Sequence, residues 1–193
     1  MAKENIIEIR WHGRGGQGAK TAALLFADAA LSEGKNIQAF PEYGPERMGA
    51  PVQSFNRISD DPITLHCAIS DPQYVVVLDP TLMSSVNVLA GVPDSGKIIV
   101  NTGKSPDEIR KELKMTKVKV YTVDASKIAM ETIGRDIPNT PMLGAMAAAT
   151  GLLNFERLMK DLEQKLGKKF ASKKEIIAGN LNAVRRAYEE VKS

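Results

Sequence analysis

Residues 11–21 read Trp-His-Gly-Arg-Gly-Gly-Gln-Gly-Ala-Lys-Thr, and the rest of the chain is organised around this stretch. An alternating apolar run, residues 6–11, comes before it and a long Ala/Leu-rich run follows, so the glycines fall where a strand becomes a helix. Glycines in such a turn permit positive φ angles and let another molecule approach main-chain atoms. The start of the following helix carries roughly +0.5 charge, which suits a phosphate or a carboxylate. The stretch therefore predicts a strand–loop–helix unit with an anion site.

The glycine spacing alone does not decide which ligand is bound. Gly13, Gly15 and Gly18 match the G-x-G-x-x-G spacing of dinucleotide folds. Such folds also need an acidic residue about 20 positions on, at the tip of the second strand. Here the second strand ends in Pro41 and then Glu42, so the carboxylate comes late and beyond a proline. This departure disfavours a nicotinamide or flavin site.

A P-loop is a second alternative, because Gly13 and Gly18 bracket four residues and Lys20 follows. The P-loop pattern places its lysine directly after the second glycine, whereas Ala19 intervenes here. One helical residue turns a side chain by about 100°, so Lys20 and Thr21 are expected to face away from phosphates bound in the usual way. A tight structural turn without a ligand also stays open.

Composition points to one soluble domain. The 193 residues carry 26 basic and 23 acidic side chains, and a net charge of +3 is too slight to argue for a nucleic-acid partner. The first residues do not resemble a signal peptide, and no apolar run approaches the length of a membrane span. We therefore expect a single cytoplasmic domain over residues 1–193, with no nucleic-acid or membrane partner.

Cysteine and histidine usage bears on metal chemistry. The single cysteine, Cys67, excludes an internal disulfide, and an iron–sulfur cluster is normally held by several thiolates. We expect a small buried thiol at this position and no cluster on this chain. With only His12 and His66, no metal site is expected either. His12 is expected to be a packed or exposed ring rather than a catalytic base, and no catalytic residue is nominated.

A second informative stretch, residues 41–51, reads Pro-Glu-Tyr-Gly-Pro-Glu-Arg-Met-Gly-Ala-Pro. Its prolines restrain the backbone, so Glu42, Glu46 and Arg47 are expected to be held in place. In a parallel sheet this loop would lie at the carboxyl ends of the strands, at the same edge as the glycine loop. Two loops at one edge predict one site, although a surface loop packed on its own prolines is the alternative.

Patterning along the chain predicts a three-layer α/β/α domain with a mainly parallel, open, Rossmann-like sheet and possible antiparallel edge strands. Strands are expected at residues 6–11, 37–40, 52–59, 63–69, 74–78, 97–101 and 118–123, and helices at residues 18–33, 81–89, 105–115, 125–133, 142–153, 155–166 and 173–191. Residues 63–69 are expected to pair with residues 52–59 as a hairpin. The helix at 142–153 is apolar on nearly every face, so we expect it in the core or against another subunit.

Two short polar runs follow predicted strands. Asn101 and Thr102 lie at the tip of one strand and are a candidate third part of the site, although Asn is also an ordinary strand terminator. Residues 75–79 end in Asp79 and resemble the metal-holding strand of a P-loop enzyme, but buried parallel strands produce that string anyway.

Taken together, several motifs resemble the gamma subunit of the 2-oxoacid:ferredoxin oxidoreductases. The resemblance spans nearly the whole chain and rests on Gly13-Arg14-Gly15-Gly16-Gln17-Gly18, Tyr43-Gly44-Pro45-Glu46-Arg47-Met48-Gly49-Ala50-Pro51-Val52, Arg57-Ile58-Ser59, Asp124-Ala125 and Asn139-Thr140-Pro141-Met142-Leu143-Gly144-Ala145. The form of the second motif resembles the pyruvate and branched 2-oxoacid members more than the 2-oxoglutarate type.

This resemblance implies an enzyme complex that decarboxylates a 2-oxoacid on thiamine diphosphate with Mg²⁺. Electrons then pass through [4Fe-4S] clusters to ferredoxin, and the acyl group is trapped on coenzyme A. The cofactors are implied to lie on alpha, beta and delta partner subunits, with none bound by this chain alone. The gamma part is associated with coenzyme A handling and with assembly. Pyruvate is the expected substrate, with 2-oxoisovalerate or indolepyruvate as alternatives. A free-standing nucleotide-binding oxidoreductase domain and a structural assembly subunit without a ligand are the competing interpretations.

The predicted site joins both lines of reasoning. The glycine loop offers main-chain donors for coenzyme A phosphates, with Arg14 and Arg47 as candidate countercharges. Arg47 could instead form an ion pair with Glu46 or Glu42, and Gln17 could bind the ligand or cap the turn. The candidate ligand-binding residues are Gly13, Arg14, Gly15, Gly16, Gln17, Gly18, Glu46, Arg47, Asn101 and Thr102.

Overall fold

The computed structural model describes residues 6–42, 49–114 and 117–193. Glu46 and Arg47 lie outside the described residues, so their predicted roles stay predictions. The strands are β1 Ile7–Arg14, β2 Asn36–Glu42, β3 Pro51–Ser59, β4 Tyr74–Val77, β5 Lys97–Asn101 and β6 Lys119–Val123. The helices are α1 Ala19–Ser32, the 3₁₀ helix η1 Pro80–Ser84, α2 Pro106–Glu112, α3 Ala125–Ile133, α4 Asn139–Thr150, α5 Phe155–Lys169 and α6 Lys174–Glu190.

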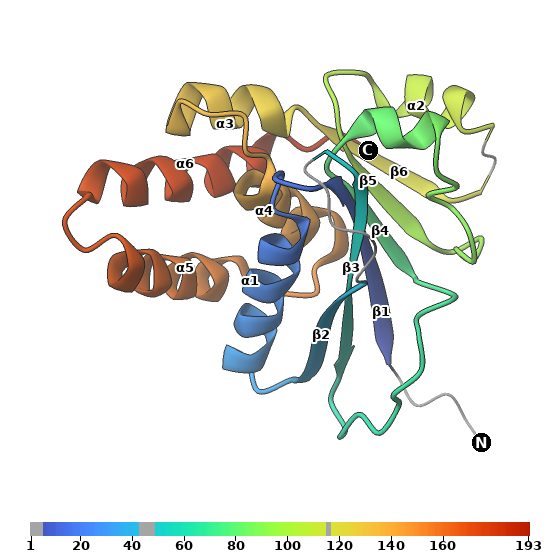
Figure 1. The fold of residues 1–193 in the computed structure, drawn as a ribbon, viewed down its shortest axis with the longest axis horizontal. Helices are drawn as coiled ribbons and strands as arrows, with labels where there is room; N and C mark the ends of the chain where they lie inside the picture. Colours follow the sequence, from blue (N-terminus) through green and yellow to red (C-terminus); the bar gives the residue numbers. More distant parts are fainter. Residues whose placement is uncertain (1–5, 43–48, 115–116) are drawn as a thin grey trace.

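These strands form a six-stranded sheet in the order β2-β3-β1-β4-β5-β6. From β1 to β6 the neighbours are parallel, whereas β3 runs antiparallel to both β1 and β2. Helices α1, α3, α4, α5 and α6 gather on one side of the sheet and α2 lies on the other (Figure 1). The predicted three-layer α/β fold with a mainly parallel sheet and antiparallel edge strands is confirmed.

The predicted strand at residues 63–69 is wrong. This segment has no regular structure, and β3 pairs with β2 instead. The carbonyl groups of Leu65 and Cys67 accept hydrogen bonds from side chains: Gln38 Nε2 donates to the first at 3.0 Å, and Arg57 Nη2 to the second at 2.7 Å. Both edges of β3 are already paired, one with β1 and the other with β2, so residues 63–69 cannot join β3 as a hairpin partner. Cys67 is exposed, so the prediction of a buried thiol is also wrong.

The predicted helix at residues 81–89 is shorter than expected. Only Pro80–Ser84 is helical, as a 3₁₀ turn, and irregular turns follow it. Asp79 begins this turn, because its carboxylate accepts a hydrogen bond from the Thr81 amide at 2.9 Å. Asp79, which starts this turn, also accepts hydrogen bonds from Arg14 and Gln17 of the glycine loop.

The all-apolar helix α4 lies in the core of this chain. Met142, Leu143 and Met146 are fully buried, and α4 contacts α6, α1, α3 and the sheet. A Cβ added at Gly144 would lie 2.1 Å from the carbonyl oxygen of Val184 on α6, so only glycine allows the two backbones to come this close. The core alternative predicted for this helix is confirmed.

A buried polar chain fixes the start of α1 on the sheet. Trp11 Nε1 donates to Asn56 Oδ1 at 2.7 Å, and Asn56 Nδ2 donates to the carbonyl oxygen of Ala23 at 3.0 Å. Asn56 is fully buried, and unpaired polar groups at such a position would cost about 1–3 kcal/mol. These bonds join β1, β3 and α1 directly behind the glycine loop.

No helix in the described ranges is long and apolar enough to cross a membrane. In the same ranges, no group of three or more His, Cys, Asp or Glu side chains is placed to hold a metal ion.

Candidate ligand-binding site

The glycine loop between β1 and α1 has backbone angles that favour glycine. Gly16 has φ +100° and Gly18 has φ +81°, both in the left-handed region. A Cβ added at Gly18 would also lie 2.7 Å from Asn139 Nδ2 at the start of α4, whereas space is open beside Gly16. The loop is therefore shaped by two glycines for different reasons, conformation alone at Gly16 and conformation plus close packing at Gly18.

The loop is joined by its backbone to the end of the proline-rich segment. The Gly15 amide donates to the carbonyl oxygen of Ala50 at 2.9 Å, and the Gly49 amide donates to the carbonyl oxygen of Gly15 at 3.1 Å. The Gln17 amide donates to the carbonyl oxygen of Arg14 at 3.0 Å, which closes a turn inside the loop. Two of the main-chain donors considered for a ligand, at Gly15 and Gln17, are thus already paired.

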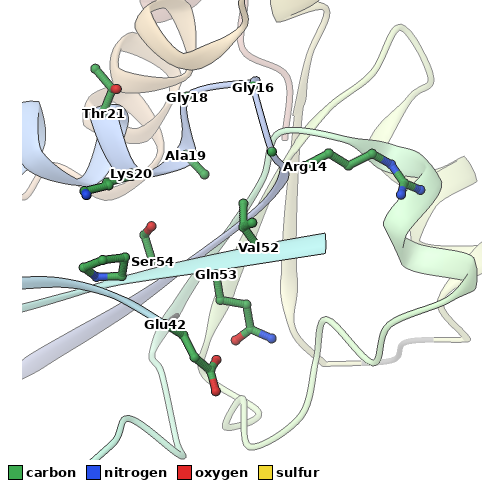
Figure 2. A pocket seen from close by; sticks show the side chains of 12 residues that line it. Arg14, Gly16, Gly18, Ala19, Lys20, Thr21, Glu42, Val52, Gln53 and Ser54 are labelled. Carbon is green, nitrogen blue, oxygen red and sulfur yellow. The ribbon is translucent and has the colours of Figure 1, made fainter. Parts of the chain in front are cut away.

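Side chains on one side of the loop form the Asp79 cluster, which consists of Arg14, Gln17, Asp79 and Thr81. Arg14 Nε donates to Asp79 Oδ2 at 3.0 Å and Gln17 Nε2 donates to the same oxygen at 2.9 Å. Arg14 Nη2 donates to Thr81 Oγ1 at 2.9 Å, and Gln17 Oε1 accepts from the Arg14 amide at 2.7 Å. The Arg14 side chain therefore points away from the helix start, as Figure 2 shows.

The carboxylate of Asp79 is the centre of this cluster. Burial raises its pKa, but hydrogen bonds from Thr81 and Gln17 and the positive charge of Arg14 outweigh burial, so its pKa lies below the ordinary value. Asp79 is therefore ionised at neutral pH. An ionised carboxylate that faces Arg14 leaves little of that charge for a ligand.

On the other side of the loop, a cleft of about 530 Å³ opens between the start of α1 and the strands β2 and β3. The cleft is lined by Arg14, Gly15, Gly16, Gly18, Ala19, Lys20, Thr21, Pro41, Glu42, Val52, Gln53 and Ser54. Lys20 and Thr21, which the sequence suggested would face away from phosphates bound in the P-loop manner, both line this cleft. The cleft lies on the β2–β3 side of the helix, whereas a P-loop holds its phosphates within the loop itself.

No side chain among the described residues caps the start of α1 with a hydrogen bond. Gly18 occupies the N-cap position without a side-chain hydrogen bond, and the first turn holds no acidic residue. A helix leaves its first amides without intrahelical acceptors and carries partial positive charge there. This end of α1 is therefore suited to a negatively charged group in the cleft.

The side of β1 away from α1 carries a buried basic pair. Arg10 Nε donates to His12 Nε2 at 3.0 Å, and Arg10 Nη2 donates to the carbonyl oxygens of Val88 and Ala90 at 3.0 and 2.7 Å. Burial, helped by the charge of Arg10, lowers the pKa of His12 to about 3. His12 is thus a packed neutral ring, one of the two states expected from the sequence, and it does not line the cleft.

The third predicted part of the site lies elsewhere. Asn101 Nδ2 donates to the carbonyl oxygen of Leu78 at 2.8 Å and to Ser126 Oγ at 3.0 Å, and Asn101 Oδ1 accepts from the Ser126 amide at 3.0 Å. Thr102 Oγ1 accepts from the Lys104 amide at 3.2 Å. Neither residue lines the cleft, and their bonds connect the end of β5 to the residue that follows β4, to the start of α3 and to the following turn.

Sequence reasoning did not nominate Ser54, Val52, Lys20 or Thr21 as site residues. A serine and a valine within a strand carry no motif, and only the antiparallel pairing of β3 with β1 brings them opposite the helix start. Asp79 had a visible signal, since a carboxylate directly after a buried strand commonly lies at the carboxyl edge of a sheet.

Comparison with known proteins decides the family. The family model described as pyruvate ferredoxin/flavodoxin oxidoreductase matches residues 8–190. The chain belongs to this family. The predicted resemblance is thereby confirmed, and the chain is a subunit of an oxidoreductase of this family rather than a free-standing nucleotide-binding domain.

Named relatives cover nearly the whole chain. Pyruvate synthase subunit PorC of Thermotoga maritima is 49% identical over 189 residues, which is 98% of this chain and 96% of that protein. The common gamma subunit of the pyruvate/ketoisovalerate oxidoreductases of Pyrococcus furiosus is 47% identical over 185 residues, 96% of this chain and 97% of that protein. The crystal structure of pyruvate oxidoreductase subunit PORC from Thermotoga maritima matches with a TM-score of 0.85 at 45% identity, and 97% of each chain is covered.

Proposed function

We propose that this chain is the gamma subunit of a pyruvate:ferredoxin oxidoreductase and that the cleft beside α1 binds coenzyme A. In this reaction pyruvate and coenzyme A yield acetyl-coenzyme A and CO₂, and two electrons pass to ferredoxin. The whole chain, residues 1–193, serves as one domain that binds coenzyme A and contributes to assembly. Decarboxylation and electron transfer take place on other subunits.

The observation that carries the proposal is the open cleft at the uncapped start of α1. Its volume of about 530 Å³ lies within the range of about 300–1,000 Å³ that is usual for small-molecule sites. Ala19 and Val52 supply apolar walls, while Lys20 and the helix end supply positive charge for a phosphate. A ligand with phosphates at one end and an apolar arm fits this combination.

The site is narrower than the set of residues nominated from sequence. We propose that Gly16, Gly18 and the first turn of α1 face coenzyme A. Arg14 and Gln17 hold the loop in shape through Asp79, and Asn101 and Thr102 hold the neighbouring strand ends. Roles for Glu46 and Arg47 in binding stay predictions from the sequence.

The remaining parts of the enzyme are assigned to partners. We place thiamine diphosphate, Mg²⁺ and the [4Fe-4S] clusters on partner subunits, which we expect to be the alpha, beta and delta chains, with ferredoxin as the electron acceptor and the complex in the cytoplasm. Purification of the complex through a tag on this chain tests the assignment. The eluate should contain three further chains and absorb visible light, and a colourless single chain would contradict it.

The choice of 2-oxoacid belongs to the partners in this proposal. The name of the Pyrococcus furiosus relative describes one gamma subunit common to pyruvate and ketoisovalerate oxidoreductases, which supports substrate selection on other chains. A 2-oxoisovalerate or indolepyruvate oxidoreductase is therefore the second candidate. Steady-state rates with each 2-oxoacid on the purified complex separate these possibilities.

Charge reversal at the cleft tests coenzyme A binding. In the assembled complex, Lys20→Glu should raise the KM for coenzyme A about tenfold, about 1.4 kcal/mol, and leave the KM for pyruvate unchanged. The control is Lys160→Glu, which reverses an exposed lysine on α5 that does not line the cleft. An unchanged KM for coenzyme A in the Lys20 variant would leave the chain with an assembly role only.

A further inference from the structure

Ser54 is a buried polar residue without a hydrogen-bonding role for its side chain in the described part of the chain. It lies on β3, opposite Trp11 of β1 and Pro41 of β2, and only 2% of its surface is exposed. No hydrogen bond reaches its hydroxyl from the described residues. A hydroxyl that the described residues leave without a partner, on a side chain this buried, needs an explanation.

The Ser54 hydroxyl keeps access to one space, the cleft. Within the described ranges, Thr122 Oγ1 is the side-chain polar atom that is both fully enclosed and unpartnered. Ser54 Oγ also lacks a partner but is not enclosed, so the small exposed part of Ser54 includes this atom. Because Ser54 lines the cleft, its hydroxyl is open toward whatever the cleft binds.

The direction of the side chain agrees with this. In Figure 2 the Ser54 side chain points from β3 toward the first turn of α1, whereas Glu42 and Gln53 extend to the other side of the strands. Alternation along β3 places Ser54 on the face that α1 covers. Its hydroxyl and the uncapped start of α1 therefore approach the same volume from opposite walls.

We infer that Ser54 is a ligand-binding residue whose hydroxyl donates a hydrogen bond to a phosphate oxygen held at the first turn of α1. The helix end attracts the negative charge and the serine, on the facing strand, fixes the position of the group. Phosphate oxygens accept such hydrogen bonds strongly because they are charged. This inference rests on the proposed coenzyme A site and names the residue that orients a phosphate in it.

A matched pair of variants isolates the hydroxyl. Ser54→Thr and Ser54→Val add side chains of nearly the same shape and both suit a strand, but only threonine keeps the hydroxyl. In the assembled complex, Ser54→Val should raise the KM for coenzyme A about tenfold with kcat unchanged, and Ser54→Thr should stay within about twofold of the wild type. Equal KM values for the two variants would overturn the inference.

A control on the same strand reports the cost of changing a buried serine. Ser59 is 4% exposed, and its hydroxyl accepts a hydrogen bond from the Asp61 amide at 3.0 Å, outside the cleft. Ser59→Ala should lower the melting temperature of the complex and leave the KM for coenzyme A unchanged. A rise in that KM for Ser59→Ala equal to the rise for Ser54→Val would mean that strand packing, not a phosphate contact, moves the constant.

Shortened acceptors identify the phosphate. If the KM penalty of Ser54→Val disappears with dephospho-coenzyme A, the contact is to the 3′-phosphate, and if the penalty persists, the contact is to the diphosphate. Either outcome supports a phosphate contact. A penalty of the same size with pantetheine, which carries no phosphate, would overturn it.

The failure of this inference can be told apart from failure of the coenzyme A site. If Lys20→Glu raises the KM for coenzyme A but Ser54→Val does not, the site stands and Ser54 is not part of it. If neither variant changes that KM, both the site and the inference fall.

Discussion

The two sides of the glycine loop differ in how their polar groups are used. On the side of η1, Arg14 and Gln17 are bonded to Asp79, and Asp79 is bonded to Thr81. On the side of β3, the start of α1 has no capping side chain and Ser54 has no partner among the described residues. A single motif thus has a closed side and an open side.

This difference is the basis of our proposal for which residues of the loop face a ligand. The side chains that look most like ligand contacts in the sequence, an arginine and a glutamine, are the ones that brace the loop. The open side consists of glycines, a helix end and one serine from a distant strand. Preorganisation of this kind lowers the cost of ordering a site when the ligand arrives.

Loss of the Asp79 carboxylate should break the closed side with the largest effect. Asp79→Ala leaves Arg14 and Gln17 without their shared acceptor, so we expect a loss of about 3 kcal/mol in the free energy of unfolding. Urea unfolding measures it. Asp79→Asn, which keeps the acceptor oxygen but not the charge, should cost less, and equal losses for both variants would show that the charge carries the cluster.

Acid should destabilise the chain through His12, next to the loop. Its pKa is lowered from 6.5 to about 3 on folding, so the unfolded state binds a proton first as the pH falls and stability drops between these two values. Between about pH 7.5 and about pH 5 the loss should be about 2 kcal/mol. Asp79, with a folded pKa below 3.8, loses its contribution only at lower pH.

A variant separates His12 from other titrating groups. His12→Gln can still accept a hydrogen bond from Arg10 but does not titrate, so the difference between urea-unfolding free energies at about pH 7.5 and about pH 5 should shrink by most of that amount. A variant with the same pH dependence as the wild type would assign the acid sensitivity to another residue.

Substitution of the two left-handed glycines should lower the stability by a smaller amount. Gly16→Ala meets no atom within 4 Å and should cost about 1 kcal/mol for its positive φ alone. Gly18→Ala meets Asn139 as well, so it should cost about 1 kcal/mol more. Thermal unfolding of both variants measures which loses more stability. A larger loss for Gly16→Ala would show that the space beside Gly16 is occupied and contradict the open side of the loop.

Arg14→Met should have the smallest effect on stability, and it tests most directly the distinction between the closed and the open side of the loop. The side chain is 32% exposed and Asp79 keeps its bonds from Gln17 and Thr81, so the loss in unfolding free energy should be below about 1 kcal/mol. The KM for coenzyme A should change less than about twofold. A tenfold rise in that KM would place Arg14 on the ligand and remove the distinction between the two sides.

Local patterns predicted the elements that local sequence determines. Residues 97–101 and 125–133 match β5 and α3 residue for residue. A continuous apolar run bounded by polar residues is typical of a buried strand, and Asp124 caps the start of the helix. The segment at residues 63–69 has the alternation of a strand. It stays irregular because β1 and β2 occupy both edges of β3, and side chains of Gln38 and Arg57 bind its carbonyl groups instead.

The site was less predictable for the same physical reason. The glycine loop and its position before α1 follow from the sequence, as does its contact with the end of the proline-rich segment. The engagement of Arg14 by Asp79 joins residues 65 positions apart, and Ser54 meets α1 only through an antiparallel pairing. Contacts of this range depend on the packed fold, so no local pattern reports them.

The glycine contacts of the helical layer also bear on how motion passes through the molecule. Gly144 leaves no gap between α4 and Val184 of α6, and Asn139, the first residue of α4, rests against Gly18. The contacts from α6 to α4 and from α4 to the glycine loop are therefore direct, with no flexible side chains between the backbones at Gly144. We therefore expect a displacement of α6 to move α4, and with it the glycine loop beside the cleft.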